Sequence, residues 1–117
     1  MGETNYNEIV KDISTYAAKL RKDIPDTMKG FGLMSKSASD DGALTEKTKE
    51  LIATGIAVAI HCDGCIGFHV RTLVKLGTTR QEFEEVLGMA IYMGGGPALM
   101  YASKALRAWE EFGGAKE

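Results

Sequence analysis

Residues 45–69 read TEKTKELIATGIAVAIHCDGCIGFH, and this stretch decides the fold class predicted for the chain. Thr45 is suited to cap a helix N-terminus, and the nearby Glu50 favours the positive end of the helix dipole. From residue 51 to residue 60 all but two side chains are apolar, so we expect this helix to be buried on all sides. Gly55 costs about 1 kcal/mol relative to alanine in mid-helix, which suggests close helix packing or a bend.

Apolar residues recur at helical spacing through most of the remaining chain. Pro25 and Pro97 are placed to open helices, Gly77 to close one, and Thr79 with Glu82 forms a capping-box pattern. The predicted helices cover about 6–20, 25–36, 45–60, 63–76, 79–93 and 97–109. Nothing predicts a strand or a repeat. We therefore expect one all-α domain over residues 1–117, a bundle of about six short helices.

The composition indicates a soluble globular protein of 117 residues, with 44% hydrophobic residues and a formal net charge of −2. Without a basic surplus the chain is not expected to bind nucleic acid. It contains no apolar run of roughly 20 residues, so no membrane span is predicted. The first residues do not follow the pattern of a signal peptide. Together with only two, closely spaced cysteines, this predicts a cytoplasmic protein in a reducing compartment.

The two cysteines, Cys62 and Cys65, form a CxxC pair. Two thiols at this spacing can form and release a disulfide when they lie at a helix N-terminus, where free N–H groups and the helix dipole stabilise a thiolate. Gly64 removes bulk between the sulfurs, whereas Asp63 is a negative neighbour that should oppose thiolate formation. This spacing predicts thiol–disulfide chemistry rather than structural cross-linking.

His69 follows the pair by one helical turn. On a continuing helix Cys62, Cys65 and His69 fall within about 60° of one another, and His69 leans back toward Cys65. An imidazole there can take the proton of a thiol. The helix end thus acts mainly on Cys62 and the histidine mainly on Cys65, and the residues alone leave open which sulfur attacks first.

Glu50, the CxxC pair and His69 together resemble the Glu…CxxC…His signature of the AhpD-like (alkylhydroperoxidase) family of the carboxymuconolactone decarboxylase superfamily. Residues 45–53 and 93–98 look like the same family, and the resemblance covers roughly residues 20–112. It implies an all-helical fold that assembles into homo-oligomers, as trimers or hexamers. It also implies a peroxide- or disulfide-reducing dithiol, with Glu50 and His69 in a proton relay and Cys65 as the peroxide-attacking sulfur.

The resemblance predicts a thiol-dependent peroxidase without a cofactor of its own. One thiolate becomes a sulfenic acid, the second thiol condenses with it, and an external dithiol of lipoyl or thioredoxin type reduces the disulfide. The best-known peroxidase members carry a histidine immediately before the second cysteine, where this chain has Gly64. This departure favours, as an alternative, a protein disulfide reductase. The decarboxylase branch is a poorer match because it does not need a CxxC pair.

A non-catalytic oligomeric or zinc-binding module is the alternative from another class. Zinc usually takes four ligands, and His61 and His69 could complete a Cys2His2 set. The two histidines would have to converge on one ion from opposite sides of a tight turn, so we expect no metal site.

Glu50 presents a geometric problem. Twelve residues of straight helix rise about 18 Å, so Glu50 cannot reach Cys62 along one helix. Two solutions are expected: the helix breaks near Gly55, or Glu50 serves the dithiol of a neighbouring subunit.

Overall fold

The computed structural model describes residues 5–116. This part of the chain is all-helical and consists of five helices: α1 (Tyr6–Asp23), α2 (Pro25–Ser39), α3 (Glu46–Ala59), α4 (Asp63–Lys75) and α5 (Arg80–Glu111). The predicted fold class is therefore confirmed. None of the helices in residues 5–116 is long and apolar enough to cross a membrane. The N-terminal four residues, which bear on the signal-peptide prediction, lie outside the described residues.

The difference between six predicted helices and five observed ones lies in α5. The glycine run 94–96 does bend the chain where a break was predicted, because Gly95 has a left-handed φ of 72°. The backbone resumes its helix at once, with Pro97 in the first turn after the kink. The structure therefore has a kinked helix where two separate helices were expected. The proline lacks the N–H that a straight helix would use, so the kink costs no additional hydrogen bond at that position.

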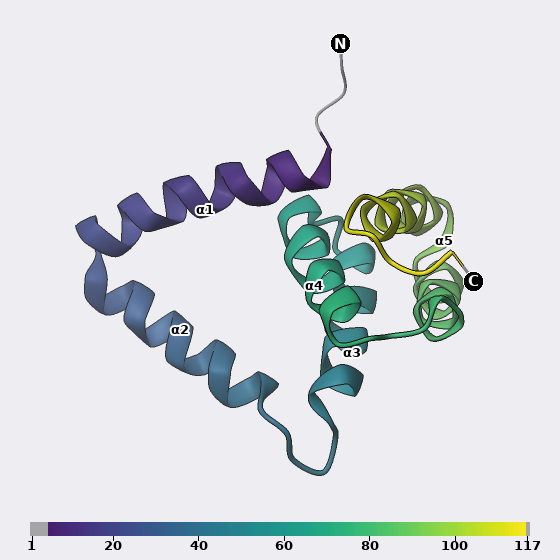
Figure 1. Ribbon diagram of the computed structural model, residues 1–117, viewed down its shortest axis with the longest axis horizontal. Helices are drawn as coiled ribbons and strands as arrows, with labels where there is room; N and C mark the ends of the chain where they lie inside the picture. Colours follow the sequence, from purple (N-terminus) through teal and green to yellow (C-terminus); the bar gives the residue numbers. More distant parts are fainter. Residues whose placement is uncertain (1–4, 117) are drawn as a thin grey trace.

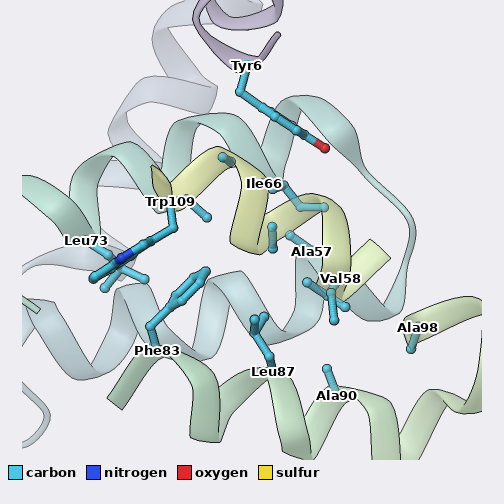
Figure 2. Close-up of a cluster of buried hydrophobic side chains, with 14 residues drawn as sticks. Tyr6, Ala57, Val58, Ile66, Leu73, Phe83, Leu87, Ala90, Ala98 and Trp109 are labelled. Atoms are coloured by element: carbon cyan, nitrogen blue, oxygen red, sulfur yellow. The ribbon is translucent and has the colours of Figure 1, made fainter. Parts of the chain in front are cut away.

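The core lies between α3, α4 and α5, which pack closely against one another (Figure 1). Phe83 at the start of α5 stacks on Trp109 near its end, with ring centroids 4.6 Å apart, so the kink folds α5 back on itself (Figure 2). The fully buried side chains of Ile66, Leu73 and Val58 complete this cluster. The buried aromatic pair thus ties the two halves of α5 to the helices that carry the dithiol.

Gly55 lies where α3 packs closely against α5. A Cβ at this position would lie 3.2 Å from Val86 Cγ1, so the predicted close helix packing is confirmed and the helix does not break. The prediction that α3 is buried on all sides is wrong for the single chain. Ile52, Ile56 and Ile60 are about half exposed, because α4 and α5 cover only part of the helix.

The first two helices form a long hairpin that leaves the core (Figure 1). Only the first turns of α1 are anchored, where Tyr6 and Val10 are buried against α4. No residue of α2 is buried. The apolar side chains that give these helices their amphipathic pattern, such as Phe31, Leu33 and Met34, are mostly exposed.

Candidate active site

The turn between α3 and α4 places the dithiol. His61 has a left-handed φ of 62°, and the backbone N–H of Cys62 donates to Ala57 O at 3.0 Å, which closes α3 as a Schellman motif. Because this turn is short, α4 begins at once and runs back along α3. Histidine tolerates the left-handed region better than most side chains, although glycine is the usual residue there.

Cys62 is the N-cap residue of α4, as the sequence predicted for a cysteine at a helix N-terminus. Its Sγ accepts a bond from the backbone N–H of Cys65 at 3.1 Å. The two cysteines form a disulfide, and their Cα atoms are 5.2 Å apart. Both residues are partly exposed. The helix end can therefore stabilise a thiolate on Cys62 in the reduced protein, and an external reactant can reach the pair.

His69 and Glu50 meet within one chain. The imidazole Nδ1 lies 2.7 Å from Glu50 Oε1, and the carboxylate side chain is only 8% exposed. The predicted break near Gly55 is wrong, because α3 is continuous. Antiparallel α4 instead brings His69 of the same chain back alongside the first turns of α3. The other predicted solution, in which Glu50 serves the dithiol of a neighbouring subunit, stays a prediction.

The hydrogen bond also orients the imidazole. With Nδ1 held on Glu50 Oε1, the other ring nitrogen, Nε2, is the one left to exchange a proton with a reactant. A cavity of about 500 Å³ between α2 and the bundle is lined by Glu50 and Thr72. The site thus combines an imidazole held by a buried carboxylate with an open cavity beside that carboxylate.

Gly64 lies where α1 crosses the dithiol. A Cβ built on Gly64 would fall in the space that the Ile13 Cδ1 methyl occupies, and one on Gly67 would meet Val10. The role predicted for Gly64 is to remove bulk between the sulfurs. The structure adds that the absent side chain lets the first helix pack directly on the CxxC segment.

Asp63, between the two cysteines, has partners that no sequence pattern indicated. The Tyr6 hydroxyl donates to Asp63 Oδ1 at 2.7 Å, and Lys104 Nζ lies 3.4 Å from Asp63 Oδ2. Burial and the neighbouring Asp63 raise the pKa of Tyr6 well above its ordinary value, so its hydroxyl stays protonated. These partners lie 57 and 41 residues away in sequence, which is why local spacing could not reveal them.

The two histidines make separate contacts and do not converge on one point, as a shared metal site would require. His61 stacks on Tyr101, with ring centroids 4.6 Å apart, and His69 is bound to Glu50. Within residues 5–116, no group of three or more histidine, cysteine or acidic side chains is arranged to hold a metal ion.

The geometry of the site agrees with a comparison against protein families. Residues 25–108 match the model of the carboxymuconolactone decarboxylase family. The chain belongs to the carboxymuconolactone decarboxylase family. This range contains the dithiol, His69 and Glu50, and it leaves out α1, which begins before it.

Relatives of the family share most of the chain. A carboxymuconolactone decarboxylase family protein of Legionella pneumophila, solved in its apo form, has 60% identity and a TM-score of 0.90, with coverage of 92% of this chain and 96% of that one. A Thermotoga maritima structure has 26% identity and a TM-score of 0.83, covering 91% and 93% of the two chains. An uncharacterized protein of Cupriavidus necator is 46% identical over 82 residues, 70% of this chain and 73% of its own. The AhpD-like resemblance is consistent with this membership.

Proposed function

We propose that the protein is a thiol-dependent peroxidase of the alkylhydroperoxide reductase type. The observation that carries the proposal is that the disulfide-forming pair, Cys62 and Cys65, lies at the start of α4 and that His69, farther along α4, binds the acidic Glu50 of α3. A redox-active disulfide, a base and a carboxylate that orients the base are the groups such a cycle needs. An antioxidative role has also been suggested for the Thermotoga maritima family member.

In the proposed cycle Cys65 attacks. His69 Nε2 takes the thiol proton, and the Cys65 thiolate attacks the terminal peroxide oxygen. The O–O bond breaks, a sulfenic acid forms on Cys65, and the alkoxide leaves as an alcohol after receiving a proton from the imidazolium. Cys62 then displaces water from the sulfenic acid to form the disulfide. Two electrons from an external dithiol, of lipoyl or thioredoxin type, reduce it by exchange.

Peroxide pulses on the reduced protein test this order of attack. We expect loss of two thiols per chain in the unaltered protein. The variant Cys62→Ser should accumulate a sulfenic acid that dimedone labels, whereas Cys65→Ser should not. His69→Ala and Glu50→Gln should slow thiol loss by roughly 10²-fold or more, as for removal of a general base or its orienting partner. Labelling of Cys65→Ser alone would reverse the assignment of the two sulfurs.

A protein disulfide reductase is the second candidate, and the packing at Gly64 favours it. The best-known peroxidase members of the AhpD-like family carry a histidine at the position of Gly64, but in this chain the Ile13 side chain occupies the space that such a side chain would need. The distinguishing experiment offers the reduced protein an alkylhydroperoxide or a small disulfide in separate reactions. If peroxide leaves both thiols intact while the disulfide is reduced, the reductase assignment replaces the peroxidase one.

We also propose that the protein works as a cytoplasmic homo-oligomer, a trimer or hexamer. An apolar groove of about 670 Å³ runs between α3 and α5, where Ile52, Ile56, Met89 and Met93 are exposed. Met89 and Met93 are thus outside the core of this chain and open to a subunit interface. Light scattering of the purified protein tests the assembly, and a monomer at all concentrations would contradict it.

A further inference from the structure

Asp63 is the charged residue between the two cysteines, and three helices converge on it. It is the first residue of α4, Tyr6 comes from α1, and Lys104 comes from the second half of α5. The backbone N–H of Tyr6 donates to Glu111 Oε1 at 2.7 Å, so the start of α1 is held from both sides. The hydroxyl of Tyr6 and the ammonium of Lys104 contact different oxygens of the same carboxylate.

This arrangement matters because a carboxylate beside a thiolate raises the free energy of the anion. An unpaired Asp63 would therefore raise the pKa of the neighbouring thiols and lower the share of reactive thiolate near neutral pH. The hydrogen bond from Tyr6 holds one oxygen in a fixed direction, and Lys104 offsets the negative charge at the other. Tyr6 and Lys104 together therefore keep the negative charge of Asp63 from cancelling the stabilisation that the helix N-terminus gives to the thiolate.

We propose that Tyr6 and Lys104 are positioning residues that set the acidity of the Cys62–Cys65 dithiol through Asp63. The inference deepens the proposed function, because it concerns the thiolate on which either the peroxidase or the reductase cycle depends. It also gives α1, which begins outside the matched family range, a part in the chemistry of α4.

Other charged or titratable groups act on the same region. They are His69 on α4, Glu50 on α3 through that imidazole, His61 in the turn before the pair, Tyr101 on α5, and Glu111 on α5 through the backbone of Tyr6. Lys104 Nζ also lies 4.6 Å from the centre of the Tyr101 ring, a contact that fixes the lysine head near the dithiol. The variants of Tyr6, Lys104 and Asp63 described below leave all of these groups in place.

The experiment measures the rate of iodoacetamide alkylation against pH in the reduced protein freed of reductant. The rate follows the thiolate fraction, so the profile reports thiol acidity without any peroxide or disulfide substrate. We expect Tyr6→Phe and Lys104→Met each to lower the rate near neutral pH by roughly two- to fivefold, the size typical of partly exposed charge pairs. We expect Asp63→Asn to raise it.

A double-mutant cycle separates this role from a purely structural one. Once Asp63→Asn removes the charge, adding Tyr6→Phe should change the alkylation profile little, because only the charged carboxylate transmits the effect. An equal effect of Tyr6→Phe in both backgrounds would overturn the proposal. If the unaltered protein has neither peroxidase nor reductase activity, while Tyr6→Phe and Lys104→Met still lower its alkylation rate through Asp63, the proposed function alone is overturned.

Matched controls exist on α1. Lys19 Nζ lies 4.7 Å from the centre of the Tyr16 ring, which resembles the Lys104–Tyr101 contact, in the half of α1 that leaves the bundle (Figure 1). The variants Lys19→Met and Tyr16→Phe remove the same chemical groups away from the dithiol. They should leave the alkylation profile unchanged, and a shift as large as that of Lys104→Met would show a non-specific effect of charge.

Discussion

The bundle formed by α3, α4 and α5 differs sharply from the arm, residues 14–39, which comprises the second half of α1 and all of α2. The bundle buries Trp109 and Phe83 completely, whereas no residue of the arm is buried. Both regions have amphipathic helices, and the arm exposes large apolar side chains such as Leu33 at 71%. Apolar periodicity therefore identifies the apolar face of a helix, but it does not show which other element covers that face.

The bundle also carries the chemistry. The dithiol, the imidazole and the acid come from α3 and α4, while the arm contributes Phe31 and other side chains to the rim of the cavity beside Glu50. The first turns of α1, which precede the arm, are the only part of the N-terminal hairpin anchored on the CxxC segment. The stability of the site should therefore depend on the bundle, and the arm should be free to serve other contacts.

The largest expected difference concerns truncation of apolar side chains. Trp109→Ala should lower the free energy of unfolding by about 3–5 kcal/mol, because it leaves a cavity beside Phe83. Leu33→Ala should change it by less than about 0.5 kcal/mol in a monomer, because the side chain is already hydrated. Urea unfolding at several protein concentrations measures both. A large, concentration-dependent loss in Leu33→Ala would mean that a second copy covers the arm.

A smaller expected difference concerns two helical glycines. A Cβ on Gly67 would overlap Val10 and press on Tyr6, whereas one on Gly32 in α2 meets nothing within 4 Å. Gly67→Ala should therefore destabilise the protein by about 1–3 kcal/mol through overpacking. Gly32→Ala should stabilise α2 by up to about 1 kcal/mol through helix propensity. Urea midpoints of the two variants give the comparison, and two changes of the same sign would contradict the observed packing of α1 on α4.

Features set by neighbouring residues could be predicted from the sequence. Thr79 and Glu82 do form a reciprocal capping box, Gly77 does close α4 in a left-handed conformation, and the glycine run does bend α5. Each depends on hydrogen bonds or dihedral angles within a few residues. Cys62 at the start of α4 belongs to the same class, since the CxxC segment and the helix that follows it are contiguous.

Features set by the direction of the chain could not be predicted. The pairing of Glu50 with His69 depends on the direction in which the turn at His61 sends α4. The spacing of apolar residues in the sequence does not reveal the angle between α3 and α4. The contacts of Asp63 with Tyr6 and Lys104 join three helices that are far apart in sequence. The rise of a straight helix does keep Glu50 away from Cys62 along α3, but α4 returns along the same helix and brings His69 to Glu50.

The smallest expected effect is a pH dependence at the junction between the bundle and the N-terminal hairpin. The folded-state pKa of Tyr6 is raised by burial and by Asp63, so folding favours the protonated hydroxyl. The stabilisation is therefore complete below the unfolded tyrosine pKa of about 10 and is lost as the pH rises above that value toward the folded pKa. We expect the difference in the free energy of unfolding between the unaltered protein and Tyr6→Phe to shrink in this alkaline range.

Urea midpoints of both proteins from about pH 8 to about pH 11 measure this difference in stability. All other titratable residues are common to the two proteins, so their contributions cancel when one midpoint is subtracted from the other. Tyr16→Phe is the control, because Tyr16 is 58% exposed and its hydroxyl is not buried at an interface. Its difference from the unaltered protein should stay flat with pH. A flat difference for Tyr6→Phe as well would mean that the hydroxyl does not stabilise α1 through the carboxylate, and that α1 is held on the bundle by the packing of Val10 and the Tyr6 ring alone.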